Sequence, residues 1–345
     1  MSTIETRSVA AGRESAPPRP LWHSILVRPE TMTLVLLVVA VFGASALSPY
    51  FLDISYILRS FTRSAEFAIV ALVLTMVIIA GEIDLSPAAN MALSACLFAY
   101  AQAAGVPMPL AILIGLASGV LMGVVNGLMV IGLQLPSIIV TIGTMIFYRG
   151  VAQVIAGDKS IRVPDWFVGI NNVLVGGVPV PVILFVLLSI VLGLVLGVTV
   201  FGRQIYQIGT NEIAARHAGI RSRRIKMILF VLIGFVSAVA GLMTASRLGS
   251  VRYDLGLGGE LQMVLMAMLG GTYIFGGRGT ILGTFLAAWL LVIVSTGMTV
   301  ANLLPATQLT VLGILLIVSI IAKNRKPGGT TCSGKRFSAS RPRRP

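Results

Sequence analysis

Charged residues are scarce in this chain. Only 11% of its 345 residues are charged, whereas 56% are apolar. A typical soluble domain carries charge on about a quarter of its residues, so this balance excludes a soluble globular protein. Cysteine is also scarce: Cys96 lies in an apolar run and Cys332 in a basic tail. Two cysteines in such different surroundings offer neither a disulfide framework nor a zinc site.

Histidine is equally rare, with His23 near the N-terminus and His217 in a basic loop, and this excludes a histidine-based site inside a membrane. A chain that hydrolysed ATP by itself would need a phosphate-binding loop. Residues 329–335 satisfy the spacing of that loop, but Arg336 occupies the Ser/Thr position that holds magnesium. The stretch lies in a tail of disordered composition. We therefore expect no catalytic residue, no metal site and no enzyme activity.

What the chain does have is long runs without any charge. They cover residues 85–148 (64 residues), 279–322 (44 residues) and 166–202 (37 residues). Because one spanning helix needs only about 20 apolar residues, these runs predict an all-α, polytopic transmembrane bundle. Glycine, proline and charge interruptions divide it into ten spans. The predicted spans are 31–48, 62–80, 86–104, 110–131, 137–156, 179–201, 226–246, 261–277, 281–300 and 304–322.

One of these spans, 261–277, is short and rich in glycine. It either crosses the membrane fully or forms a re-entrant or broken helix.

The distribution of charge predicts the orientation of the chain. With the N-terminus inside, the 26 basic residues divide 19 inside to 7 outside, while the 12 acids divide 6 to 6. This positive-inside bias predicts that both termini are cytoplasmic.

The same topology predicts three regions. They are an N-terminal cytoplasmic tail (1–30), a membrane domain (31–322) with a cytoplasmic loop at 202–226, and a disordered C-terminal tail (323–345). The C-terminal tail holds eight basic and no acidic residues, which favours contact with anionic membrane lipid. No folded domain presents these charges, so we expect no nucleic acid partner.

The loop from Phe201 to Lys226 is long, basic and patterned. Asn211 suits an N-cap, Glu212 places negative charge on a first helical turn, and Gly219 suits the left-handed position after a helix end. Ala214 and Ala215 between them are strong helix formers. A short helix is marginal alone in water, so it needs a packing partner, or it lies at the lipid interface anchored by the arginines at 221, 223 and 224.

Four blocks of this sequence, in order, resemble sugar ABC-transporter permeases of the ribose, xylose, arabinose and rhamnose type. Residues 211–220 resemble the coupling loop of that family, and residues 126–144 match it in character and order. Residues 81–86 (GEIDLS) resemble its GGIDLS motif, and residues 269–283 resemble its glycine-rich LGGT and GGRG motif. The motif residues are Gly81, Asp84, Ser86, Gly270, Gly271, Gly276, Gly277, Arg278 and Gly279.

The resemblance implies a type II importer fold in the bacterial inner membrane. It implies that a cytoplasmic ATPase, which uses ATP and magnesium, receives the short helix in a groove, whereas this chain itself binds no cofactor. It further implies a periplasmic sugar-binding protein and a second permease, either another copy or a paralogue. The implied coupling residues are Asn211, Glu212, Ala214, Ala215, Arg216 and Gly219. Relatives of this type carry pentoses, hexoses, deoxyhexoses such as rhamnose, or autoinducer-2.

Neutral polar residues in or beside the blocks are candidates for the sugar pathway, because sugars are bound by amides and hydroxyls. Interhelical hydrogen bonding is the alternative for each of them. These candidates are Asn90, Asn126, Thr141 and Thr144. Outside the membrane, the segments 149–165 and 247–260 carry mixed charge and form either a docking surface for the binding protein or solvated loops.

The sequence departs from the family pattern at Glu82, where glycine is usual, and at residues 87–89. Glu82 and Asp84 form either a carboxylate site or caps for the helix that begins near Ser86. A rival interpretation is an ion-coupled secondary sugar transporter, which would show carboxylates or broken helices in paired positions of two repeats. A membrane enzyme is disfavoured by the missing catalytic groups.

Overall fold

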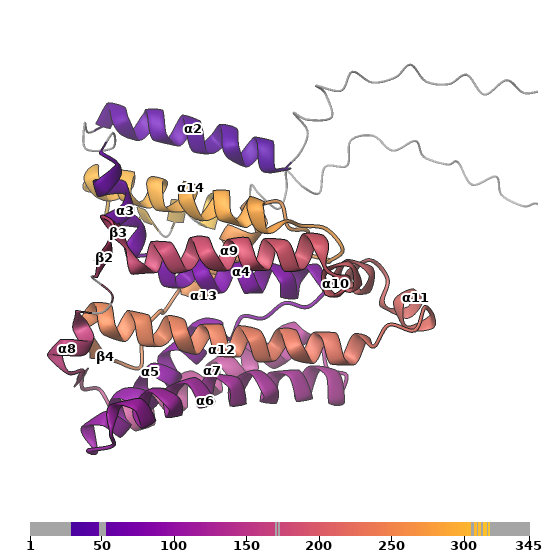
Figure 1. Cartoon of the computed structure of the whole chain (residues 1–345), viewed down its shortest axis with the longest axis horizontal. Helices are drawn as coiled ribbons and strands as arrows, with labels where there is room; N and C mark the ends of the chain where they lie inside the picture. The colour runs from indigo at the N-terminus through magenta and orange to yellow at the C-terminus, as the bar shows by residue number, and fades with distance from the viewer. Residues whose placement is uncertain are drawn as a thin grey trace, which may run out of the picture.

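The computed structural model describes residues 29–47, 53–169, 171, 173–304, 307–308, 310–311, 313–315 and 317. The predicted tails, apart from residues 29–30, and ten of the 19 residues of the predicted span 304–322 lie outside these residues. The described part is a bundle of helices that lie side by side along one direction (Figure 1). It contains four two-residue strands, paired as β1 (Ile161–Arg162) with β4 (Ser250–Val251) and β2 (Leu174–Val175) with β3 (Val178–Pro179).

The helices follow the predicted apolar runs. Five of the helices in the described residues are long and apolar enough to cross a membrane, or six when a bent pair is taken as one span. They are α6 (Met108–Gly127) continued by a π-helical turn at Leu128–Gly132, α7 (Ser137–Ala156), α9 (Val180–Val198), α12 (Ser222–Leu248) and α14 (Ile281–Val300). The bent pair is α3 (Ile54–Thr62) and α4 (Ala65–Ile79), which meet at 70°. The sequence did not predict α3.

Helices α5 (Pro87–Ala103) and α13 (Gly259–Leu269) are shorter than the spans predicted at 86–104 and 261–277. Helix α2 (Pro29–Leu47) lies at the edge of the bundle against α14 (Figure 1). Helix α5 has 17 residues, and α13 has 11 residues. At about 1.5 Å per residue, α13 is roughly 16 Å long, which is less than the apolar thickness of a bilayer.

The segment that begins with α13 nevertheless follows α4 from end to end. Gly259 lies against Phe67, near the start of α4, and the backbone N–H of Gly277 donates to the carbonyl of Ile79, the last residue of α4 (2.8 Å). Between Leu269 and Ile281 the backbone is irregular. Residues 261–277 therefore consist of part of a short helix followed by irregular backbone, and their course relative to the membrane stays a prediction.

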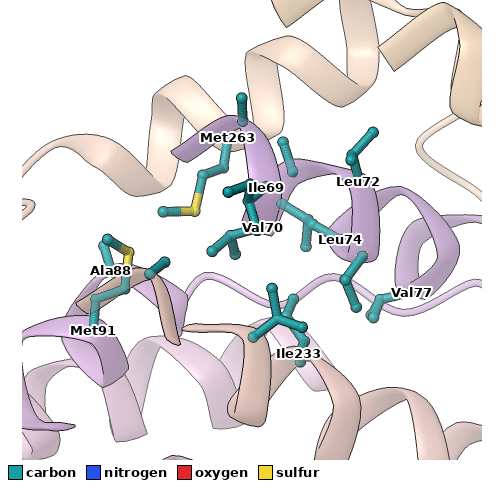
Figure 2. Close-up of a cluster of buried hydrophobic side chains, with 14 of the residues drawn as sticks. Ile69, Val70, Leu72, Leu74, Val77, Ala88, Met91, Ile233 and Met263 are labelled. Atoms are coloured by element: carbon teal, nitrogen blue, oxygen red, sulfur yellow. The ribbon is translucent and has the colours of Figure 1, made fainter. Parts of the chain in front are cut away.

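Helix α4 forms the centre of the bundle. Every residue from Ala65 to Ile79 except Phe67 is buried, as expected for a helix that is apolar on all sides. Figure 2 shows its side chains meeting those of three other helices. These contacts join Ile69, Val70, Leu72, Leu74 and Val77 with Ala88 and Met91 of α5, Ile233 of α12 and Met263 of α13. Helices α6, α7 and α9 instead expose most of their apolar surface.

The two ends of the bundle gather the loops that the predicted topology places on opposite sides. At one end, called here the α11 end, residues 79–86, 137, 209–222 and 276–280 lie together. At the other, called the β1 end, residues 66, 149, 161–163 and 247–255 lie together. Loops that the predicted topology assigns to the same side of the membrane therefore lie at the same end of the bundle. The cytoplasmic location of both termini stays a prediction.

Candidate functional site

The loop 202–226 contains the short helix that its sequence predicted. Helix α11 (Glu212–His217) begins after Asn211, whose side chain accepts a hydrogen bond from the backbone N–H of Ala214 (3.0 Å). The predicted N-cap is therefore confirmed. Gly219 has φ +82°, the left-handed conformation that glycine adopts without strain. The loop also holds α10 (Val200–Thr210), a helix that the sequence analysis missed.

Helix α11 projects from the end of the bundle (Figure 1) and packs mainly against α10 and α12, its neighbours in the chain. Ala215 is its one buried residue. The side chain of Ile213 is 71% exposed and Ala214 is exposed as well. An exposed isoleucine on a short, capped helix presents an apolar surface to a partner.

Three glycine-containing segments meet beside α11, and we call this contact the glycine junction. A side-chain carbon on Gly209 of α10 would overlap the carbonyl of Ile79. One on Gly276 would come within 2.8 Å of the Cα atom of Gly81. Gly277 donates its N–H to Ile79 as described above. The backbones of the 81–86 block, the 276–283 block and α10 therefore touch directly, which only residues without a side chain permit.

Direct backbone contact also explains the paired glycines of the 269–283 block. A side chain on Gly283 would overlap the carbonyl of Gly270, so α13 and α14 are in backbone contact there. Gly271, Gly276, Gly277 and Gly279 have positive φ angles. The carbonyl of Arg278 closes the turn by accepting from Tyr273 N–H (2.9 Å), and its side chain is exposed. The glycines of this block therefore permit close backbone packing and a tight turn.

An ion-pair chain runs from the 81–86 block to α11. The ammonium group of Lys226 donates to Glu82 Oε1 and to Glu212 Oε2, both at 2.6 Å. Arg216 then donates to Glu212 Oε1 (2.6 Å). The Glu82 carboxylate is thus held by Lys226 and not at the start of α5, which gives it a structural role other than a cap. Lys226 lies outside the 81–86 block, so the sequence of that block alone does not show this ion pair.

Asp84, in contrast, does stabilise the start of α5. Its Oδ1 accepts from the backbone N–H and the hydroxyl of Ser86, at 2.9 and 2.7 Å. Asn126 of α6 donates to the same Ser86 hydroxyl (2.8 Å), and the Tyr148 hydroxyl of α7 lies 3.0 Å from Asn126 Oδ1. This buried polar network joins α5, α6 and α7.

The other pathway candidates are also buried and hydrogen-bonded within the chain. The Thr141 hydroxyl donates to the carbonyl of Ile83 (3.3 Å), and the Thr144 hydroxyl to that of Thr141 (3.3 Å). Asn90 Oδ1 accepts from the Ser94 hydroxyl (3.2 Å). The Thr141 contact joins α7 to the 81–86 segment, whereas the Thr144 and Asn90 contacts lie within α7 and within α5. A role of the four residues in translocation stays a prediction.

At the opposite end, the two segments predicted as outer loops are brought together. Strand β1 pairs Ile161 with Val251 of β4. The guanidinium of Arg149 donates to the carbonyls of Tyr253 (2.9 Å) and Leu255 (2.7 Å). Among the described residues, no group of three or more His, Cys, Asp or Glu is arranged to hold a metal ion at either end.

Sequence reasoning missed Gly209, Tyr148 and Lys226. Gly209 and Tyr148 have no local signal, because their partners are distant in sequence. Lys226 did offer one: it is a charged residue at the edge of a long apolar run, which is costly unless the charge is paired. Its side chain is 10% exposed.

Acidification is expected to weaken the packing of α11. Burial alone would raise the pKa of the Glu212 carboxyl, but hydrogen bonds from Lys226 and Arg216 outweigh it and hold the pKa below its ordinary value of 4.5. Such a carboxylate stabilises the fold above its unfolded-state pKa, and the contribution is lost as the pH falls through the folded-state pKa. The melting temperature of the wild type minus that of Glu212→Gln should stay constant from about pH 7 to about pH 5 and shrink below it. A difference that shrinks already near neutral pH would contradict this.

Comparison with known proteins places this arrangement among transport proteins. The family described as branched-chain amino acid transport system, permease component, matches residues 56–320. The autoinducer 2 import system permease protein LsrD of Klebsiella pneumoniae is 33% identical over 302 residues, covering 86% of this chain and 91% of the relative. The LsrD proteins of an Enterobacter species and of Escherichia coli are also 33% identical and cover 86% and 84% of this chain, and 92% and 90% of their own lengths. No solved structure matches the chain.

Proposed function

Because the chain belongs to the family of branched-chain amino acid transport system permease components, we propose that it is the membrane permease subunit of an ABC importer for a monosaccharide or a sugar-like molecule. Family membership agrees with the resemblance drawn from the four sequence blocks, and the apolar helices make it a multi-pass membrane protein. The LsrD relatives are named as autoinducer 2 permeases, which supports a small, sugar-like, uncharged substrate. The bacterial inner membrane is the proposed location.

The single observation that carries this proposal is the α11 surface. A capped helix projects from the bundle, Ile213 is exposed on it, and its base is held to α12 by an ion pair. We assign this surface to a separate cytoplasmic ATPase, with Asn211, Glu212, Ala214, Ala215, Arg216 and Gly219 shaping the helix. ATP and magnesium are used by that partner.

The rest of the proposal concerns assembly. A periplasmic binding protein would deliver the substrate to the β1 end, where residues 149–165 and 247–260 pack together. A second copy or a paralogue would complete the pathway, in a topology of ten spans with both termini cytoplasmic, a membrane domain over 31–322 and cytoplasmic tails on either side. An ion-coupled transporter is not favoured, because the chain belongs to a permease-component family.

The substitution Ile213→Glu tests the ATPase surface. Because the Ile213 side chain is 71% exposed, the change leaves the fold intact while placing a charge in an apolar contact. ATPase activity that co-purifies with a tagged chain expressed from its own locus should fall more than about tenfold, as for a residue that anchors an interface. The matched control is Leu257→Glu, since Leu257 is 73% exposed at the opposite end of the bundle.

Two results would count against the proposal. Equal activity with the Ile213 and Leu257 variants would remove α11 from the ATPase contact. Absence of ATPase from the wild-type preparation, together with sugar uptake by vesicles that depends on an ion gradient, would replace the importer by a secondary transporter.

A further inference from the structure

The ion-pair chain at α11 joins two parts of the molecule that are far apart in sequence. Lys226 is 144 residues from Glu82, yet its ammonium group contacts the carboxylates of Glu82 and Glu212 at the same distance. The side chains of Lys226 and Glu82 are 10% and 13% exposed. Charges this buried need partners, because an unpaired ion out of water is costly.

The charges alternate and sum to zero. Two carboxylates, on Glu82 and Glu212, face one ammonium on Lys226 and one guanidinium on Arg216. Arg216 is further fixed by its Nε–H, which donates to the Ser222 hydroxyl (3.0 Å). Removal of Lys226 would leave two carboxylates without their shared partner.

The Glu82 end of this chain continues into the membrane helices. The N–H of Ile83 donates to the Ser137 hydroxyl (3.1 Å) at the start of α7, and the Ile83 carbonyl accepts from Thr141. Asp84 and Ser86 lead into α5 and, through Asn126, to α6. Displacement of Glu82 therefore acts on the ends of three helices.

A cavity beside the chain gives it room to move. It has a volume of about 380 Å³, and its lining combines the charged side chains of Glu82, Glu212, Arg216, Arg223 and Lys226 with residues 130–131 and 134–137. Polar walls of this kind admit water, so the ion pairs can lengthen or exchange partners without being transferred to an apolar environment.

We propose that Glu82 and Lys226 are positioning residues that carry movement of α11 into the 82–86 segment and from there to α5, α6 and α7. This inference rests on the proposed function, in which an ATPase moves α11. The link depends on the glutamate at the second position of the 81–86 block (GEIDLS), and it therefore belongs to this chain's own side chains.

Hydrogen exchange of the intact complex tests the link. The complex is purified through a tag on this chain, and backbone exchange is compared with ADP and with a non-hydrolysable ATP analogue. In the wild type, nucleotide should change exchange both in α11 and in residues 82–86, the latter by about tenfold, a typical coupling between two sites. In Glu82→Gln the change in α11 should persist, and the change in 82–86 should fall below about twofold.

Control variants separate this link from simple loss of charge or of folding. Arg223→Gln removes one positive charge from the same cavity wall and leaves the Lys226 contacts in place, so it should respond like the wild type. If Glu82→Gln does not fold, Lys226→Met interrupts the link at its other residue, and Glu82→Gly removes the Glu82 side chain altogether.

The outcomes distinguish the two proposals. If exchange in 82–86 responds equally in the wild type and in Glu82→Gln, or does not respond in the wild type while α11 does, the Glu82 link is wrong. If nucleotide leaves α11 unchanged in the wild type, the ATPase contact itself is wrong.

Discussion

The variant Gly209→Ala is expected to melt at a markedly lower temperature than the wild type. The added methyl group would overlap the carbonyl of Ile79, and that carbonyl already accepts the N–H of Gly277. Relief of the overlap must separate α10 from the end of α4 and break this hydrogen bond. Overpacking together with an unpaired buried group costs about 3 kcal/mol or more, so the melting temperature in detergent should fall by roughly 5–10 °C.

The matched control for Gly209→Ala is Gly193→Ala in α9. No atom lies within 4 Å of the position that the methyl group would take there. Alanine is the better helix former by about 1 kcal/mol, so this variant should melt at the wild-type temperature or slightly above it. Equal melting temperatures for the two alanine variants would show that the glycine junction is not a direct backbone contact.

The variant Arg247→Met is expected to be strongly destabilised at the other end of the bundle. Glu66 is 1% exposed, and its Oε1 accepts from Arg247 Nε–H (2.8 Å). Its second oxygen has no hydrogen-bond partner among the described residues. Removal of the arginine leaves a buried carboxylate with no counter-charge, which costs about 3–5 kcal/mol. Thermal unfolding in detergent measures this loss.

Two further variants identify the cause of the Arg247 effect. The double variant Glu66→Gln with Arg247→Met removes both charges and should recover much of the lost stability. Arg252→Gln breaks the Arg252–Asp254 pair, whose side chains are 49% and 41% exposed, and should cost less than about 1 kcal/mol. A double variant no more stable than Arg247→Met would mean that lost packing, and not the unpaired charge, dominates.

Helix α11 could be predicted from a short stretch of sequence because capping is local. Asn211 bonds to a backbone group three residues away, and the conformation of Gly219 depends on its own backbone. The long helices could also be predicted, because an uncharged run is read directly from consecutive residues. Helix α10 was missed because Thr199, its cap, lies inside the run that was assigned to the preceding span.

The ion-pair chain and the glycine junction could not be predicted in this way. Glu82 and Lys226 are each ambiguous alone, and the contact between them requires α12 to lie beside the 81–86 segment. The 269–283 block was recognised as a family motif. Its packing partners, the backbones of Ile79 and Gly209, could not be predicted from the sequence.

The sequence by itself determined that this is a multi-pass helical membrane protein, which family it resembles, and where its short projecting helix begins and ends. Only the tertiary structure decided which apolar helices are central. Helices α4 and α9 are both apolar on nearly every side, yet α4 is buried almost completely and α9 is largely exposed. Lipid tails are as apolar as a protein interior. Hydropathy therefore places a helix in the membrane without showing whether lipid or protein surrounds it.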